Sequence, residues 1–178
     1  NPFKKFKMKR ELTERVYLEA NEVKRIEKLR IRIKNNKGRT YDAKDVFLVE
    51  CYTGLRISDI LNLRWKNYNG NELSVRMRKT DKDHVIKVNK VVKKIIDNRY
   101  ETLEVNKEDI TPDRYIFNIL PVDINKISPH EALNAISSAT AIINKNLKEI
   151  AKRVKIQKNI STHTARHTFA YLMVAKNV

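Results

Sequence analysis

Hydrophobic residues recur three or four positions apart in several stretches of the chain, the spacing that places them on one face of a helix. The first stretch covers residues 19–34, where basic residues fill the opposite face. Its apolar positions are Val23, Ile26, Leu29 and Ile33. Similar patterns predict further helices over residues 56–63, 91–103 and 131–153, and from Thr164 onward. A mostly helical domain is therefore expected.

A helix over residues 43–53 has a different pattern. Its four consecutive apolar residues, at positions 46–49, indicate burial on nearly all sides. Asp42 precedes this helix and is a plausible N-cap, because a short carboxylate can accept hydrogen bonds from the first unpaired amides. Gly54 follows it, where a residue without a Cβ adopts the left-handed cap conformation at little cost.

Strict alternation of apolar and polar residues predicts one β-hairpin. Apolar residues occupy every second position from Leu73 to Met77 and resume with Ile86 after the polar run TDKD. Residues 72–89 are therefore expected to form two antiparallel strands. Lys79 has the same parity as Met77 and is expected to point inward from the hairpin tip. The predicted fold class is α+β, mostly helical with a small antiparallel sheet.

Composition favours a nucleic-acid partner. The chain has 178 residues, of which 41% are hydrophobic, enough for one domain with its own core. Lys and Arg number 38 against 21 Asp and Glu, a net charge of +17, and such an excess favours a polyanion because phosphate neutralisation releases counterions. The sequence has a single cysteine, Cys51, and neither zinc-ligand spacing nor a membrane-spanning apolar run. We therefore expect a cytoplasmic, nucleoid-associated protein without membrane contact.

Two motifs place a cationic residue three positions from a second polar group. They are GLRISD, with Arg56 and Asp59, and HTAR, with His163 and Arg166. Each pair alone also fits an ordinary role, a surface ion pair for Arg56 and Asp59 and a capping or packed histidine for His163. Together with Lys79 they suit phosphoryl transfer, because two guanidinium groups can clamp phosphate oxygens while His and Lys move protons.

The acidic clusters that hold Mg²⁺ in metal-dependent nucleases do not appear in the sequence. We therefore expect no metal, with arginine neutralising the charge of the phosphate.

The runs CYTGLRISDILNLRW, KTDK and HTARHTFA together resemble the tyrosine recombinase (phage integrase) family, in particular integrases of bacterial mobile elements. The resemblance covers nearly the whole chain. Residues 1–16 look like a basic linker from an upstream core-binding domain, and residues 17–178 look like the catalytic domain, truncated before its C-terminal nucleophile segment. The fold implied is that of the recombinase catalytic domain.

The resemblance also implies residue roles. Arg56 and Arg166 match the two arginines that hold a DNA phosphate, Lys79 matches the hairpin lysine that protonates the leaving 5′-oxygen, and His163 matches the first histidine of H-x-x-R. Asp59 matches an acidic position that braces the arginine. The supporting residue His167, with its neighbour Thr168, matches a structural turn beside the site, where we expect His167 to pack.

In this family a tyrosine attacks a DNA phosphate, leaving a 3′-phosphotyrosyl enzyme and a free 5′-hydroxyl. The family's nucleophile lies well beyond H-x-x-R, so we expect it beyond Val178 and none within this chain. Tyr52, Tyr68 and Tyr171 are not expected to replace it, since Tyr171 lies off the Arg166 face in an apolar run. The fragment is therefore expected to be inactive alone and monomeric, and the full-length protein to be a homotetramer on double-stranded DNA.

Two alternatives remain at this point. A non-catalytic DNA-binding module with the integrase fold explains the charge, but it does not need a proton donor beside a phosphate. A type IB topoisomerase shares the chemistry and the fold, but the GLRISD and HTARHTFA motifs resemble recombinases more closely.

Overall fold

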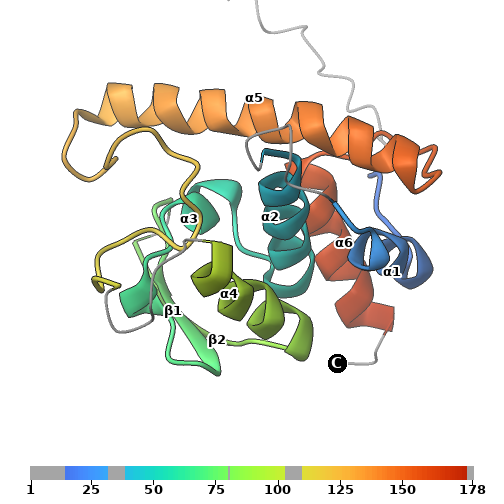
Figure 1. Cartoon of the computed structure of the whole chain (residues 1–178), viewed down its shortest axis with the longest axis horizontal. Coiled ribbons are helices and arrows are strands. Elements are labelled where there is room, and N and C mark those ends of the chain that lie inside the picture. The colour runs from blue at the N-terminus through green and yellow to red at the C-terminus, as the bar shows by residue number, and fades with distance from the viewer. Residues whose placement is uncertain (1–14, 32–38, 80, 103–109, 176–178) are drawn as a thin grey trace, which may run out of the picture.

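The computed structural model of the chain describes residues 15–31, 39–79, 81–102 and 110–175. They form packed helices and a two-stranded antiparallel sheet, which confirms the predicted fold class (Figure 1). The elements are α1 (Ala20–Lys28), α2 (Arg39–Thr53), α3 (Ile57–Leu61), the 3₁₀ helix η1 (Trp65–Asn67), β1 (Glu72–Arg76), β2 (Asp83–Lys87), α4 (Lys90–Thr102), α5 (Pro129–Arg153) and α6 (Thr162–Ala175). None of the helices in the described ranges combines the length and apolar character that crossing a bilayer requires.

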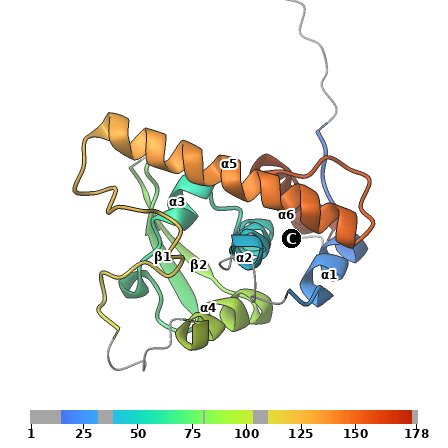
Figure 2. The same ribbon diagram turned by 45° about the horizontal axis from the view of Figure 1, so that its top comes forward.

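Helix α2 lies at the centre of the fold. It packs against α1, α3, α4, α5 and α6, and Figures 1 and 2 show these helices around it, with the long α5 lying across the others. All four apolar residues from Val46 to Val49 are buried, as their unbroken run predicted. Because α2 is enclosed on several sides, groups at its C-terminal end have well-defined positions.

Helix α5 begins at a capping box. The Ser128 hydroxyl accepts a hydrogen bond from the Glu131 amide at 3.3 Å, and the Glu131 carboxylate accepts one from the Ser128 amide at 3.0 Å. Pro129 occupies the first helical position, where its missing amide costs nothing. The helix therefore begins two residues before the predicted start at Glu131, whereas its predicted end at Arg153 is confirmed.

Helix α1 is shorter than predicted. It ends at Lys28, and Leu29 has an extended backbone with φ −63° and ψ 117°. The Leu29 carbonyl accepts a hydrogen bond from Lys44 Nζ at 3.1 Å, so a side chain of α2 supplies the donor that a further turn of helix would have provided. The predicted continuation through residues 29–31 is wrong, and the part beyond Ile31 lies outside the described residues.

Asp42 lies in the first turn of α2 and does not cap it, because the helix begins at Arg39, four residues before the predicted start at residue 43. Its carboxylate accepts a hydrogen bond from Arg99 Nη1 at 2.5 Å, and Arg99 Nη2 donates to Asp45 at 2.9 Å. Arg99 is buried on α4, with its guanidinium 5.0 Å from the centre of the Tyr41 ring and 4.8 Å from that of Phe117. Burial raises the pKa of Asp45 to about 6, and the charge of Arg99 opposes that rise. This cluster ties α2 to α4.

The remaining helix boundaries differ from the predictions by one or two residues. Helix α3 ends at Leu61, because the Leu63 carbonyl accepts a hydrogen bond from the Ile116 amide at 2.9 Å and the chain turns away to meet that segment. Helix α4 covers 90–102, one residue earlier at its start than predicted, and the predicted end at Leu103 lies outside the described residues. Helix α6 begins at Thr162, two residues before the prediction.

The predicted hairpin is confirmed. Strands β1 and β2 are antiparallel, with Glu72 opposite Lys87 and Arg76 opposite Asp83. The paired residues of β1 end at Arg76, and the turn contains Asp81 with φ of 52°. An ion pair of 2.6 Å joins Arg76 to Asp81 across this turn. Residues that follow Arg76 therefore belong to the turn and no longer follow strand parity.

Candidate active site

The guanidinium of Arg166 lies against the C-terminal end of α2. Arg166 is in the second turn of α6, and its Nη1 donates a hydrogen bond to the carbonyl of Gly54, the residue that follows α2. Carbonyls at a helix C-terminus lack amide partners and carry partial negative charge, which favours a cationic donor there. Arg56 follows two residues later, at the N-cap of α3. The residues from the two sequence motifs are therefore brought to the same junction of α2 and α3.

Gly54 allows this close approach. Its φ is +66°, in the left-handed region that favours glycine, which confirms its predicted role at the end of the helix. A Cβ at this position would lie 2.5 Å from Cδ1 of Phe169 on α6. Since no carbon atom tolerates that distance without displacement, the missing side chain lets α6 pack directly on the end of α2.

Arg56 retains hydrogen-bonding capacity. Its backbone is extended at the N-cap of α3, with φ −77° and ψ 151°. The residue is partly exposed, yet its Nη1 is inaccessible to solvent and has no hydrogen-bond partner among the residues that the structure describes. Buried guanidinium nitrogens are normally paired. No described residue therefore holds this nitrogen in place, so the side chain can turn toward an anionic ligand.

The carboxylate of Asp59 joins α3 to the hairpin. Asp59 is only 2% exposed, and within the described ranges no ion pair connects it to Arg56, so the interpretation as a surface ion pair is wrong. Its Oδ1 instead accepts a hydrogen bond from the backbone amide of Arg78 at 3.1 Å. The other oxygen, Oδ2, is inaccessible and has no partner in the described part of the chain. Asp59 therefore positions the backbone one residue before Lys79.

Lys79 itself is exposed in the hairpin turn. The predicted inward direction is wrong, because β1 ends at Arg76 and the alternation of strand side chains does not extend to position 79. The arrangement is a long flexible lysine side chain on a backbone that Asp59 holds in place.

His163, Arg166 and His167 share one face of α6, since they are three and four residues apart. His163 is exposed and His167 is half-buried. The Thr164 amide bonds to the hydroxyl of Ser161 at 3.4 Å, so Ser161 supplies the cap of this helix. The alternative of a capping or packed His163 is therefore wrong. An exposed imidazole one turn from Arg166 can reach the same ligand.

The structural turn expected at His167 and Thr168 is also not found, because both residues lie within α6. Thr168 is fully buried and has a structural role there. Its hydroxyl accepts a hydrogen bond from the Leu18 amide at 2.9 Å and donates to the Thr164 carbonyl at 2.8 Å. His167 is half-buried, and its expected packing stays a prediction.

The three tyrosines considered as nucleophiles hold other contacts. The ring of Tyr171 stacks on Tyr17 at 4.4 Å, half-buried and not enclosed in the core as expected. Tyr52 donates a hydrogen bond to the Glu27 carboxylate, and burial together with this bond raises the pKa of Tyr52. Tyr68 donates to a backbone carbonyl two residues further on, at 3.0 Å. A raised pKa opposes the activation that a nucleophile needs.

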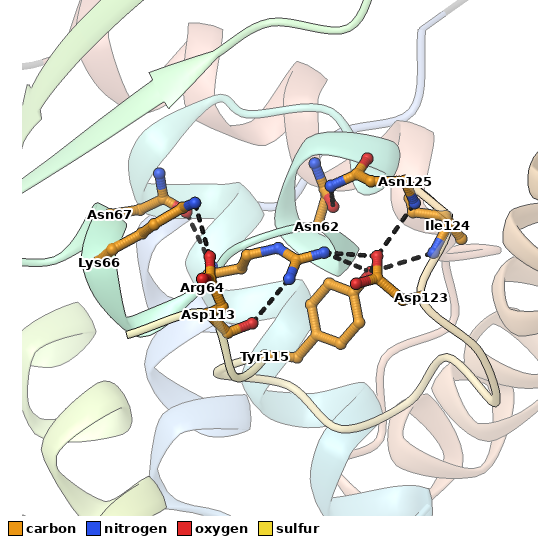
Figure 3. Close-up of polar contacts among 9 residues, drawn as sticks. All are labelled: Asn62, Arg64, Lys66, Asn67, Asp113, Tyr115, Asp123, Ile124 and Asn125. Atoms are coloured by element: carbon orange, nitrogen blue, oxygen red, sulfur yellow. Dashed lines mark hydrogen bonds and ion pairs between the residues drawn. The ribbon is translucent and has the colours of Figure 1, made fainter. Parts of the chain in front are cut away.

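A cleft of about 690 Å³ opens beside Asp59. Its cationic lining residues come from several segments: Arg64, Lys66, Arg76, Arg114 and Lys126. Figure 3 shows the wall around Arg64, whose Nη2 donates to the Asp123 carboxylate at 2.6 Å and whose Nη1 donates to the Asp113 carbonyl at 2.7 Å. The hydrogen bond from Arg64 lowers the pKa of Asp123 to about 2. Arg64 therefore fastens the loop after residue 110 to the end of α3.

The lining of this cleft includes Asp59 but none of the candidate residues Arg56, Lys79, His163 and Arg166. Sequence reasoning missed three features of this region: the Asp59 contact with the hairpin, the Arg64 cluster, and a buried carboxyl at Glu50 on α2. Glu50 sits in the run VEC, which resembles any buried helix segment, so no local signal marks it. Within the described ranges, no group of three or more His, Cys, Asp or Glu side chains is arranged to hold a metal ion.

The profile of the phage integrase family matches residues 16–178. The chain belongs to this family, whose members are tyrosine recombinases. No curated protein sequence matches this integrase-family chain. Solved structures show the same fold: the XerA recombinase is 23% identical with a TM-score of 0.59, and the match covers 94% of this chain and 53% of that one.

Two further structures are similar to this chain. The integrase from mycobacterium phage Brujita is 17% identical with a TM-score of 0.58, covering 97% of this chain and 48% of that one. The XerH site-specific recombinase, in a pre-cleavage complex with its difH substrate, is 17% identical with a TM-score of 0.59, covering 93% and 45%. The chain thus spans about half the length of these recombinases.

Proposed function

We propose that this chain is the catalytic part of a site-specific DNA recombinase that breaks and rejoins strands through a 3′-phosphotyrosyl intermediate. The observation that supports this most is a pair of contacts linking three distant segments. Arg166 bonds to the Gly54 carbonyl and Asp59 bonds to the Arg78 amide. These contacts connect α6, the α2–α3 junction and the hairpin, which are the segments that carry the candidate cationic residues.

In the proposed reaction Arg56 and Arg166 bind the non-bridging oxygens of one DNA phosphate and stabilise the charge that develops during attack. A tyrosine oxygen forms a bond to phosphorus while the bond from phosphorus to the 5′-oxygen breaks. Lys79 donates a proton to that leaving oxygen, and His163 assists proton movement at the phosphate or at the nucleophile. The phosphotyrosyl bond conserves the energy of the phosphodiester, so rejoining needs no nucleotide cofactor.

The nucleophilic tyrosine is proposed to come from another part of the protein. The contacts of Tyr52, Tyr68 and Tyr171 support this, because each ring or hydroxyl is already used within the fold.

Double-stranded DNA is the proposed partner. The net charge of +17 supports it, as does the shared fold of XerH, which was solved with a DNA substrate. We further propose that the full-length protein forms a homotetramer on DNA and that residues 1–178 alone are monomeric, which light scattering in the presence and absence of DNA would test.

Covalent capture on DNA tests the catalytic proposal. Protein expressed from the complete reading frame is incubated with a nicked suicide substrate that traps the phosphotyrosyl adduct. Arg166→Ala is expected to abolish the adduct, whereas the matched control Arg153→Ala, at the exposed end of α5, is expected to retain it. Equal DNA affinity of all proteins with no adduct from any of them would favour a non-catalytic DNA-binding module. Plasmid relaxation without strand exchange would favour a type IB topoisomerase.

A further inference from the structure

Glu50 is a buried carboxyl on α2. Glu50 is 0% exposed, and neither of its carboxylate oxygens has a hydrogen-bond partner among the described residues. An unpaired carboxyl in the interior costs free energy, and an apolar side chain of similar size fills the same space without that cost. Folding alone therefore does not account for an acidic residue at this position.

Glu50 lies one helical turn before the carbonyl that Arg166 binds. The Gly54 amide donates to the Glu50 carbonyl at 2.9 Å, the last helical hydrogen bond of α2, and the Gly54 carbonyl accepts the bond from Arg166. Burial raises the pKa of Glu50 well above its ordinary value, and the charge of Arg166 acts in the opposite direction. Among the described residues, Arg166 is the one cation whose charge lowers the pKa of Glu50.

A second buried acid on the same helix offers a comparison. Asp45 bonds directly to Arg99 at 2.9 Å, so that arginine is committed to a structural contact. Glu50 makes no such bond to Arg166. An arginine that keeps donors available can bind a ligand with them, while the carbonyl oxygen of a nearby buried carboxyl, neutral or ionised, still favours one orientation of the guanidinium.

We propose that Glu50 is a positioning residue for Arg166, a polar group inside the α2–α6 interface that holds the guanidinium in one orientation on the end of α2. This proposal rests on the proposed function, because the orientation matters only where Arg166 binds a phosphate. The carboxyl acts through Arg166 and does not touch DNA.

Two substitutions separate positioning from packing. Glu50→Leu removes the polar group and keeps the volume, whereas Glu50→Gln keeps a carbonyl oxygen of the same shape. Leu at this position is expected to preserve or raise the urea midpoint while lowering the single-turnover cleavage rate of the complete protein by about tenfold to a hundredfold, the effect of a misplaced group at a reacting centre. Gln is expected to restore most of that rate. Glu149→Leu, on the exposed face of α5, is the control.

A second measurement does not need activity. The Nε–Hε signal of Arg166 in the ¹⁵N NMR spectrum, assigned by its loss in Arg166→Lys, reports how ordered the guanidinium is. In Glu50→Leu the heteronuclear NOE of the Arg166 Nε–Hε signal is expected to fall toward the value of an exposed arginine. In Glu50→Gln this NOE is expected to stay at the wild-type value. If the wild-type protein cleaves no DNA, this measurement still decides the role of Glu50.

Two results would overturn the proposal. One is an Arg166 NOE and a cleavage rate that are both unchanged in Glu50→Leu. If the leucine variant fails to fold, the apolar variant Glu50→Met takes its place in this test. The other is a parallel loss of stability and cleavage in Glu50→Gln and Glu50→Leu, which would make Glu50 an ordinary core residue.

Discussion

Replacing Gly54 by alanine tests the junction of α2 and α6 on which the candidate site depends. Two separate costs are expected. The φ of Gly54 is +66°, so alanine there is forced into the left-handed region, which destabilises the fold by about 1–2 kcal/mol. The new Cβ would also lie 2.5 Å from the Phe169 ring, and overpacking of this kind costs about 1–3 kcal/mol. Together they predict a loss of about 2–5 kcal/mol in the free energy of unfolding.

Gly70 provides the matched control. Its φ is +95°, but a Cβ there would meet only the Lys93 Nζ at 3.9 Å, ordinary contact with the end of a flexible side chain. Gly70→Ala is therefore expected to show the conformational cost alone, about 1–2 kcal/mol. Urea denaturation followed by circular dichroism gives both values from the midpoint and the slope.

A double-mutant cycle isolates the contact between the helices. In a Phe169→Ala background the ring is gone, so Gly54→Ala is expected to cost only the conformational part, and the coupling between the two positions is about 1–3 kcal/mol. The reasoning is refuted if Gly54→Ala destabilises no more than Gly70→Ala, or if its cost is the same in both backgrounds. In the covalent capture assay Gly54→Ala should also lower adduct formation, because the carbonyl that Arg166 binds is displaced.

Three further predictions concern ion pairs and tyrosines. Arg99→Leu is expected to lower the free energy of unfolding by about 3–5 kcal/mol in urea, because it removes the bonded guanidinium of the buried carboxylate of Asp45; a loss below about 1 kcal/mol contradicts this. The hydrogen bond from Arg64 lowers the pKa of Asp123 to about 2, so this bond stabilises the fold above about pH 4 and the contribution is lost as pH falls through about 2. Asp123→Asn is therefore expected to cost ~1 kcal/mol at pH 7, allowing for partial exposure, with midpoints that converge near about pH 2; a gap that stays constant with pH argues against it. Tyr171→Phe keeps the stacked ring and is expected to leave covalent capture unchanged, whereas loss of the adduct would identify Tyr171 as the nucleophile.

Features whose cause lies within a few residues were predictable from the sequence. The apolar run at positions 46–49 predicted the central helix, and Gly54 predicted its end. The alternation after Leu73 predicted the hairpin. One local signal was missed: Ser128 and Glu131 form a capping box around Pro129, and that spacing by itself fixes the start of α5.

Contacts between distant segments were not predictable in the same way. Arg64 and Asp123 are 59 residues apart, and Arg166 and Gly54 are 112 apart. A local pattern shows that a side chain is cationic, but the partner that it meets depends on how the helices pack. The direction of Lys79 failed for a related reason, because strand parity holds only as far as the paired residues extend.

The two contacts that join the candidate site each use a backbone group as one partner. Arg166 binds a carbonyl and Asp59 binds an amide, so the side chain at the second position is not required in either case. Gly54 is restricted by its backbone conformation and by the nearby ring, not by its hydrogen bond. Arg78 needs only an amide to donate, and proline alone lacks one. Side-chain motifs therefore reveal Arg166 and Asp59 but not the residues that they hold, and only the folded chain shows that these two anchor α6 and the hairpin to the same short helix junction.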